Sequence, residues 1–300
     1  MKNLFKYFKK NFIGNHNDKK CNNEKLYGAF PAGHYYSPIP TQEEIIKYIN
    51  RKTLPEKLPE VNLNKNFQYE ILNEYYKFYN DLSFPEKKSK NYRYYYNNDW
   101  FSYSDAIFLY SFLRKNKPKK IIEIGSGFST AVILDTVEFF FSYYPEITLI
   151  EPYPQRLNKL LKSEDKKYIK LFPKKIQDIS LDLFNILESG DFLFIDSSHV
   201  LKCGSDLQLI FFEILPYLPS GIFVHFHDIF YPFEYPEEWL MEGRYWNENY
   251  FLRAFLAYNS QWSIYFFNSY VFLMFNRFLK EKMPLCIKNP GGSIYLRKNV

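Results

Sequence analysis

Hydrophobic positions follow two different spacings along the chain and divide it into predicted strands and helices. From residue 120 onward, short apolar runs alternate with segments whose apolar residues have helical spacing. Such runs, bounded by polar residues, are typical of buried strands. The predicted strands are 120–124, 147–150, 168–172, 191–195 and 221–226, and the predicted helices among them are 129–143, 156–161 and 205–215. This alternation predicts an α/β fold with a parallel sheet and helices on both faces.

The residues before 119 have helical spacing and no clear strand. Thr41 followed by Glu44 is a capping signal for a helix, and apolar residues at 67–82 and after Ser104 predict two more helices. We therefore expect three regions, with boundaries at 1–27, 28–118 and 119–300. The first is a polar, poorly ordered tail, the second a helical and aromatic cap, and the third the main α/β domain.

Composition narrows the classes of function. The 300 residues are 46% hydrophobic, enough for a large core, and carry a net charge of +6. Lysines are spread through a chain that is generally rich in Lys, Asn, Ile, Phe and Tyr, so we expect no nucleic-acid partner. Cys21, Cys203 and Cys286 are too far apart for a metal motif or a disulfide framework, which favours a reducing, cytoplasmic setting. Residues 1–12 lack the apolar core of a signal peptide.

One apolar segment, 262–279, approaches the length needed to span a membrane. It contains Asn268, Asn276 and Arg277, and aromatic residues outnumber leucine. We interpret it as a buried strand followed by a second element, and expect no transmembrane segment.

A glycine turn follows the first predicted strand. Gly125 and Gly127 permit a tight turn, and Ser129 and Thr130 can cap the following helix. With Glu123 before it, the Glu-x-Gly-x-Gly pattern resembles the first motif of class I S-adenosylmethionine-dependent methyltransferases. A dinucleotide-binding motif would have a third glycine where this chain has Thr130. Plain turn geometry remains the alternative to a cofactor turn.

Polar residues follow the next two predicted strands. Glu151 ends the second strand, where an acid can accept hydrogen bonds from ribose hydroxyls. The alternative is an acid that complements a helix dipole. Gln177 and Asp178 follow the third strand, where a carboxylate can accept a hydrogen bond from the exocyclic amine of adenine. The alternative is a solvated loop acid.

The ends of the fourth and fifth predicted strands carry Asp196, His199, His227 and Asp228, while His225 shares one strand face with His227. Three interpretations are open. The four residues can hold a divalent metal, with carboxylates suiting Mg²⁺ or Mn²⁺ and imidazole favouring a transition metal. A histidine can instead act without metal as the base that takes a proton from an acceptor hydroxyl. The third interpretation is a histidine pair that orients the loop.

Several blocks of the chain together resemble a bacterial group of class I methyltransferases that act as sugar- and polyketide-tailoring O-methyltransferases. The blocks are 31–40, 123–130, 194–200, 225–229 with 232 and 235–236, 246–250 and 291–293. The resemblance implies a doubly wound, mostly parallel, seven-stranded Rossmann-like sheet whose last two strands, 261–267 and 293–297, are antiparallel. It also implies an acceptor pocket walled by the aromatic loops at 34–36 and 230–245.

The same resemblance implies roles for individual residues. The Glu123 side chain and the backbone from Gly125 through Ser126 to Gly127 would face the methionine end of S-adenosyl-L-methionine. Glu151 would bind the ribose, and Asp178, beside Gln177, the adenine. Asp196 and Asp228 would hold Mg²⁺ or another divalent metal if one is used, with His199 or His227 as the base.

We therefore expect an S-adenosylmethionine-dependent methyltransferase that methylates a hydroxyl of a small molecule or glycan. The alternatives are a non-catalytic cofactor-binding protein on the same fold and an NAD-linked oxidoreductase.

Overall fold

The structure is a computed structural model that describes residues 29–300. It separates into an N-terminal unit that ends at Arg51 and a larger unit, Lys52–Val300. The predicted tail at 1–27 lies outside the described residues. The N-terminal unit contains α2, Gln42–Arg51. The Thr41 amide donates to Glu44 Oε2 at 2.7 Å and the Glu44 amide to Thr41 Oγ1 at 3.2 Å, which confirms the predicted capping pair.

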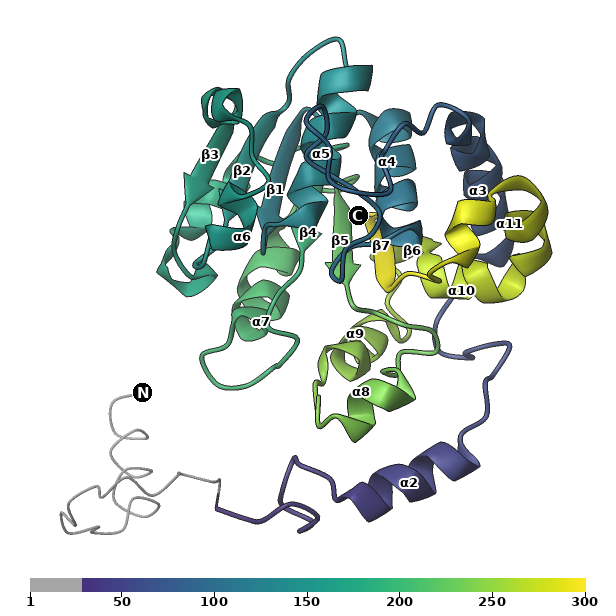
Figure 1. Cartoon of the computed structure of the whole chain (residues 1–300). Coiled ribbons are helices and arrows are strands. Elements are labelled where there is room, and N and C mark those ends of the chain that lie inside the picture. The colour runs from purple at the N-terminus through teal and green to yellow at the C-terminus, as the bar shows by residue number, and fades with distance from the viewer. Residues whose placement is uncertain (1–28) are drawn as a thin grey trace, which may run out of the picture. The chain divides into compact units, whose positions relative to one another are not determined.

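Within residues 52–300, seven strands form one sheet in the order β3-β2-β1-β4-β5-β7-β6 (Figure 1). The strands are β1 Lys120–Ile124, β2 Glu146–Ile150, β3 Ile169–Phe172, β4 Phe192–Ile195, β5 Phe223–His227, β6 Trp262–Phe267 and β7 Ser293–Lys298. The first five pair in parallel, whereas β7 pairs antiparallel with both β5 and β6. The predicted seven-stranded, mostly parallel sheet is therefore confirmed.

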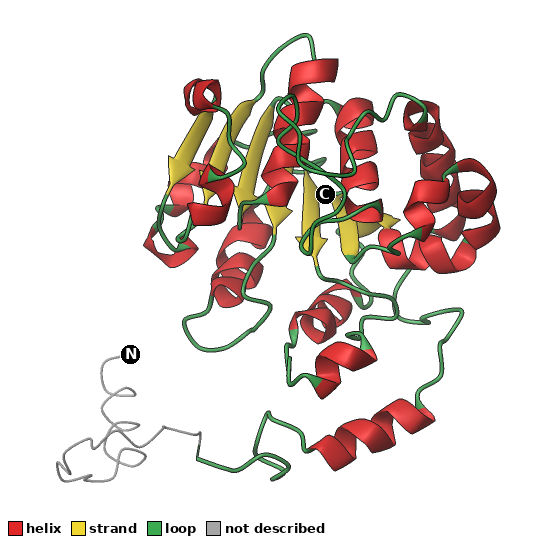
Figure 2. Ribbon diagram, in the orientation of Figure 1, coloured by secondary structure: helices red, strands yellow, loops and turns green. Residues whose placement is uncertain are grey.

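Helices cover both faces of this sheet (Figure 2). One face packs against α3 Lys65–Tyr79, α4 Ser104–Asn116 and α5 Phe128–Phe140. The other face packs against α7 Asp206–Leu209, which continues into a π-helical turn, Ile210–Ile214. The remaining α-helices are α6 Gln155–Asn158, α8 Glu237–Met241, α9 Glu248–Leu256, α10 Asn268–Met274 and α11 Asn276–Lys282. Short 3₁₀ turns are Ser163–Lys167, Ile176–Asp178, Leu181–Ile186, Leu215–Tyr217 and Pro284–Ile287.

Alternate residues of each central strand belong to two separate cores. In β4, Phe192 and Phe194 belong to the core under α4 and α5, while Leu193 and Ile195 belong to the core on the α7 face. All four are almost fully buried, as expected for a parallel strand covered on both sides. The Phe112 ring of α4 lies 4.6 Å from that of Phe192. α4 thus packs directly on the sheet, although it belongs to the segment predicted as an N-terminal cap.

A buried ion cluster fastens the loop that precedes α4. The Arg93 side chain is 2% exposed and contacts Asp135 at 2.8 Å, Glu138 at 2.6 Å and Asp165. The amide of Tyr94 donates to Asp135 at 2.8 Å. Because Asp135 and Glu138 belong to α5, these contacts join the loop to the helix that follows the glycine turn.

No helix among residues 29–300 has both the length and the apolar character needed to cross a membrane. The apolar segment 262–279 forms β6, then α10 and the beginning of α11, so its interpretation as a strand followed by a second element is confirmed. The fifth strand differs slightly from its prediction, because it begins at Phe223 and extends through His227. Both histidines of that strand are therefore part of the sheet.

Candidate active site

The glycine turn between β1 and α5 brings two neighbouring strand ends together. Gly125 has a φ of +79°, and its amide donates to Ile150 O at 2.9 Å. A Cβ on Gly125 would overlap the carbonyl oxygen of Asp196. The position therefore requires glycine for its left-handed conformation and for the close approach of the chain after β4.

Glu123, the acid before this turn, is fully buried. Its two carboxylate oxygens accept hydrogen bonds from Ser129 Oγ and Thr130 Oγ1, each at 2.5 Å. Thr130 Oγ1 also accepts from the Gly127 amide at 3.1 Å, so this hydroxyl bonds the backbone at the start of α5. Burial raises the pKa of Glu123 to about 8. The Glu123 side chain thus faces the first turn of α5.

A cavity of about 520 Å³ opens where β1, β2 and β4 end. Gly125, Glu151, Gln177 and Asp196 all contribute to its lining. Residues from three predicted strand ends therefore meet around one space. This position, beyond the carboxyl ends of parallel strands, is where open α/β sheets bind their ligands.

The Glu151 carboxylate has a fixed orientation in this cavity. Oε2 accepts from the Ser126 amide at 3.1 Å, and Oε1 accepts from the Tyr153 amide at 2.7 Å. Each oxygen still has room for a further hydrogen bond, because a carboxylate oxygen can accept two. The acid that ends β2 is thus tied to the glycine turn that follows β1.

The residues after β3 occupy a 3₁₀ turn, Ile176–Asp178. Gln177 lines the cavity and donates from Nε2 to Gly204 O at 3.1 Å. Asp178 is exposed and is not among the cavity-lining residues.

Asp196, His199 and Asp228 form a compact cluster beside the cavity. Each offers one ligand atom, and these atoms lie within 4.8 Å of one another. His199 Nε2 is 3.4 Å from Asp196 Oδ1 and 3.5 Å from Asp228 Oδ2. The structure thus brings together three residues that the sequence predicted at two separate strand ends.

Charges inside this cluster shift its pKa values. Burial would raise the pKa of Asp196, but the hydrogen bond with His199 and the charge of His227 lower it below its ordinary value. Burial raises the pKa of Asp228. Burial would lower the pKa of His199, yet its hydrogen bonds to Asp196 and Glu248 raise it well above the ordinary value. The cluster therefore favours a positive charge at its centre.

The beginning of α9 fixes the orientation of His199. Glu248 Oε2 lies 2.7 Å from His199 Nδ1, and the Glu248 side chain is 1% exposed. The Trp246 ring lies 4.5 Å from the imidazole ring. The amides of Asn247 and Glu248 both donate to His199 O, at 3.1 and 3.2 Å. Both the backbone and the side chain of His199 are thus held by one helix end.

His227 has a different set of neighbours. Its Nδ1 lies 3.3 Å from Ser293 Oγ, which donates to Asp105 Oδ1 at 2.6 Å. Because Ser293 gives its only proton to Asp105, it accepts from His227 Nδ1. His227 Nε2 is then the free nitrogen and lies 3.6 Å from Asp228 Oδ1.

His225 is enclosed by rings. It stacks on Phe194 with centroids 4.0 Å apart and on His227 at 6.0 Å, which confirms that the two histidines share a strand face. Neither ring nitrogen of His225 has a hydrogen-bond partner, and burial lowers its pKa well below the ordinary value. His225 therefore packs as a neutral aromatic ring.

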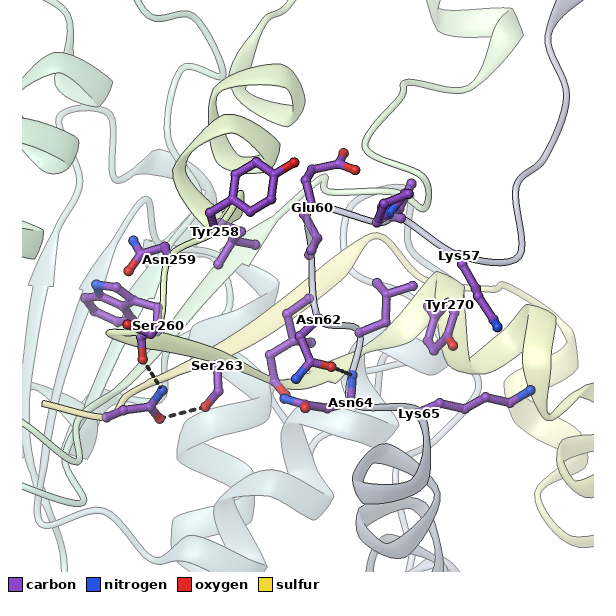
Figure 3. Close-up of a pocket in the computed structure, with 18 of the residues that line it drawn as sticks. Lys57, Glu60, Asn62, Asn64, Lys65, Tyr258, Asn259, Ser260, Ser263 and Tyr270 are labelled. Atoms are coloured by element: carbon purple, nitrogen blue, oxygen red, sulfur yellow. Dashed lines mark hydrogen bonds between the residues drawn. The ribbon is translucent and has the colours of Figure 1, made fainter.

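A larger groove of about 1030 Å³ lies beside the edge strand β6 and the loop at 56–65 (Figure 3). Its polar groups bond mainly to one another. Asn64 N donates to Asn62 Oδ1 at 3.0 Å, and Asn299 links Ser263 and Ser260 at 2.9 Å each. None of the predicted site residues contributes to its lining.

Similarity to known proteins covers the region that builds this cavity and cluster. A family model described as a methyltransferase domain matches residues 122–229. An uncharacterized protein of Archaeoglobus fulgidus is 34% identical over 168 residues, which make up 54% of this chain and 75% of that protein. The chain belongs to the class I S-adenosylmethionine-dependent methyltransferases. The predicted family is thereby confirmed.

Solved structures with similar chain paths include two methyltransferases crystallised with S-adenosylhomocysteine. One, from Podospora anserina, is 14% identical with a TM-score of 0.43, and the match covers 87% of this methyltransferase and 98% of that chain. The other, an O-methyltransferase from Bacillus cereus, is 15% identical with a TM-score of 0.41, and the match covers 85% and 97%. The family assignment rests on the domain match and not on these likenesses.

Several polar residues of this methyltransferase's site were not singled out from the sequence. Glu248 and Asn249 belong to the block 246–250 and Ser293 to the block 291–293, but neither block suggested a contact. Asp105 lies at the beginning of the helix predicted after Ser104, and no contact was predicted for it. Asn249 donates from Nδ2 to Asp228 O at 2.9 Å. A polar pair at the beginning of a helix, Glu248-Asn249, was the available signal.

Proposed function

We propose that this methyltransferase transfers the methyl group of S-adenosylmethionine to a hydroxyl oxygen of a small molecule or glycan. One observation supports this more than any other. Asp196 both lines the cavity at the ends of β1, β2 and β4 and belongs to the polar cluster with His199 and Asp228. A cofactor in the cavity and an acceptor at the cluster would therefore meet at Asp196, and holding two reactants in line is a large part of catalysis of group transfer.

The cavity supplies the groups for the cofactor. The glycine turn of Gly125, Ser126 and Gly127 would approach the methionine end through its backbone. Glu151 would accept hydrogen bonds from the ribose, because its orientation is already fixed by two backbone amides. Gln177, which lines the cavity, would lie beside the adenine. Asp178, on the same turn but outside the lining, remains a prediction as the acceptor of the adenine amine.

Glu123 would contribute indirectly. Both of its oxygens are used by hydroxyls of α5, so we assign it to positioning the helix and the glycine turn. This differs from a direct contact with the cofactor, which the motif resemblance implies.

The cluster fits a divalent metal. Its three ligand atoms lie close enough to share one ion, and two carboxylates with one imidazole form a suitable donor set. Asp196 and Asp228 would hold the ion, and a divalent ion supplies Lewis acidity that lowers the pKa of a hydroxyl. Among the chain's own groups, His227 is suited to accept the hydroxyl proton at Nε2, because Ser293 and Asp105 hold its other nitrogen.

Aromatic side chains beside the cluster suit a ring-shaped acceptor. Trp246 packs over His199, and Trp239 lies 5.4 Å from Trp246. Both come from the segment between β5 and α9, and their faces suit stacking against a sugar or another ring. The loop at 34–36 belongs to the N-terminal unit, and its place in the acceptor pocket remains a prediction.

The test separates cofactor binding from turnover. Thermal unfolding with S-adenosylhomocysteine should show a concentration-dependent stabilisation that NAD does not give, because only a bound ligand stabilises the fold by mass action. Asp228→Asn should retain this stabilisation but lose at least about 100-fold in methyl transfer. The matched control is Asp182→Asn, on an exposed turn. The methyl group should appear on oxygen in the product's carbon NMR spectrum. Full turnover in Asp228→Asn would rule out the acceptor site described here.

A further inference from the structure

The two nitrogens of His199 have different surroundings. Nδ1 lies 2.7 Å from Glu248 Oε2, in a pair whose side chains are 8% and 1% exposed. Nε2 points to the opposite side, between Asp196 and Asp228, at 3.4 and 3.5 Å. An ionised carboxylate only accepts hydrogen bonds, so Glu248 holds the proton on Nδ1, and Nε2 is the nitrogen that faces the two aspartates. Nε2 would give up its own proton when a metal binds there.

This arrangement is that of a metal-binding histidine. Such histidines usually donate their second N–H to a carboxylate, which fixes the ring and raises the basicity of the ligating nitrogen. Ligand atoms about 2.0–2.3 Å from one ion lie roughly 3–4.5 Å from each other. The spacings from His199 Nε2 to Asp196 and Asp228 fall in that range. They are long for N–H···O hydrogen bonds, whose usual range is about 2.7–3.2 Å.

The backbone of two of these three residues has a left-handed conformation. His199 and Asp228 have φ values of +60° and +57°, a conformation that costs energy for residues other than glycine and collects at functional sites. Two consecutive residues of α9 hold the strained turns, because the Glu248 amide bonds His199 O and the Asn249 side chain bonds Asp228 O. One helix end thus positions two of the three ligand-bearing residues.

We propose that His199 is the third metal ligand, positioned by Glu248, and that the site selects a first-row transition metal such as Mn²⁺ over Mg²⁺. The proposal rests on the proposed function, because it concerns the same cluster. Mg²⁺ requires a near-ideal octahedron of oxygen ligands, whereas first-row transition metals also accept an imidazole. Mn²⁺ is the member of that series whose preference for oxygen donors also suits the two aspartates. His199 then cannot also be the base, and His227 remains for that role.

The first experiment measures metal affinity on the full chain after EDTA treatment and exchange into metal-free buffer. Isothermal titration with MnCl₂ and with MgCl₂, each in the presence of S-adenosylhomocysteine, should show at least 10-fold tighter binding of Mn²⁺. Glu248→Gln keeps a side chain of the same shape but lacks the negative charge, and should weaken Mn²⁺ binding about 10- to 100-fold. The control is Glu237→Gln on the exposed side of α8, which should bind Mn²⁺ as the unaltered protein does. Equal affinities for the two metals would overturn the proposal, as would unchanged Mn²⁺ binding in Glu248→Gln.

A second measurement needs no variant and so does not depend on Glu248→Gln folding. Pulsed electron paramagnetic resonance of Mn²⁺ bound to the unaltered protein should show nitrogen couplings typical of a directly bound imidazole. Bound Mn²⁺ without such couplings would remove His199 from the ligand set. Thermal shift of the same samples measures binding of S-adenosylhomocysteine and so tests the proposed function separately. Absence of S-adenosylhomocysteine binding would contradict the proposed function. Normal S-adenosylhomocysteine binding without selectivity for Mn²⁺ would contradict only the present inference.

Discussion

Asp105 and Ser293, which are 188 positions apart in the sequence, are joined by a 2.6 Å hydrogen bond between Oδ1 and Oγ. Both side chains are buried, and the Gly292 amide donates to the same aspartate oxygen at 3.0 Å. The pair connects the beginning of α4 to the beginning of β7, and Ser293 Oγ also contacts His227 Nδ1 at 3.3 Å. Because Ser293 donates its proton to Asp105, it accepts from His227 Nδ1, and the pair thereby fixes the proton of His227 on Nδ1.

Removing the hydroxyl between them should affect turnover more than cofactor binding. In Ser293→Ala, His227 Nδ1 loses its acceptor, so we expect the turnover number to fall by at least about 10-fold, with the dissociation constant for S-adenosylhomocysteine unchanged. Ser263→Ala on the adjacent strand β6 removes an exposed hydroxyl that bonds Asn299, and should leave both values as they are. A parallel loss of cofactor affinity in Ser293→Ala would instead indicate general damage to the site.

Gly125→Ala should abolish cofactor binding and lower stability. Its Cβ would overlap Asp196 O, and its φ of +79° is unfavourable for alanine. Gly190→Ala is a matched control, because Gly190 has a φ of +88° but nothing lies within 4 Å of the added atom. The control should lose only the left-handed cost of about 1–2 kcal/mol, and Gly125→Ala should lose more. Denaturant unfolding measures the loss of stability, and titration with S-adenosylhomocysteine measures the loss of cofactor binding. Equal losses of stability in the two variants would show that the backbone at Asp196 moves away from the added Cβ at little cost.

The buried Glu123 carboxyl should make stability depend on pH. Its pKa is about 8 in the folded protein against an ordinary 4.5. Below pH 4.5 both states are protonated. Between pH 4.5 and 8 only the unfolded state ionises, so the free energy of unfolding should fall as pH rises, by at most about 1.4 kcal/mol per pH unit.

Glu123→Gln tests this prediction, because glutamine remains uncharged and retains one accepting oxygen. Urea unfolding at several pH values from 5 to 8 should show a flatter decline in Glu123→Gln than in the unaltered protein. Glu213→Gln changes an exposed glutamate on the π-helical turn and should keep the original slope. An identical slope in all three proteins would mean that Glu123 is ionised in the folded state.

Arg93→Ala should strongly destabilise the protein. It would leave the buried Asp135 and Asp165 without their cation, and breaking a buried ion pair in this way costs about 3–5 kcal/mol. Arg277→Ala is the comparison, since the side chains of Arg277 and its partner Glu281 are 91% and 54% exposed and exposed pairs contribute about 0–1 kcal/mol. Thermal unfolding of both variants gives the difference, and a mild effect at Arg93 would show that water reaches the two aspartates.

The sequence predicted the strands well where an isolated apolar run has polar neighbours, as in Ile121–Ile124. It ended β5 one residue early because His227 is a polar residue, although its side chain is buried in the sheet. The imidazole of His225 packs between rings in its neutral form, and no local pattern distinguishes such a histidine from a catalytic one. The antiparallel pair β6 and β7 came from family resemblance, since aromatic residues obscure the alternation there.

The candidate site was predictable as far as it follows the strand ends. Asp196, His199 and Asp228 were expected near each other, because neighbouring parallel strands end at the same edge of the sheet. The partners Glu248 and Ser293 were not predicted. They reach the histidines from 49 and 66 positions away, and contacts over such separations depend on how loops and helices dock, which no spacing rule encodes.

The left-handed conformation of Asp228 breaks the two-residue alternation of β5. Had the strand continued in extended form, the carboxylate would have pointed to the opposite layer of the molecule from His227. The left-handed φ of Asp228 instead brings the side chains of His227 and Asp228 to the same side of the sheet, 3.6 Å apart. The same conformation restricts position 228 to the few residues that adopt it without a large energetic cost. Asparagine, which accepts this conformation more readily than other polar residues, is the replacement that would keep the chain's path while removing the charge.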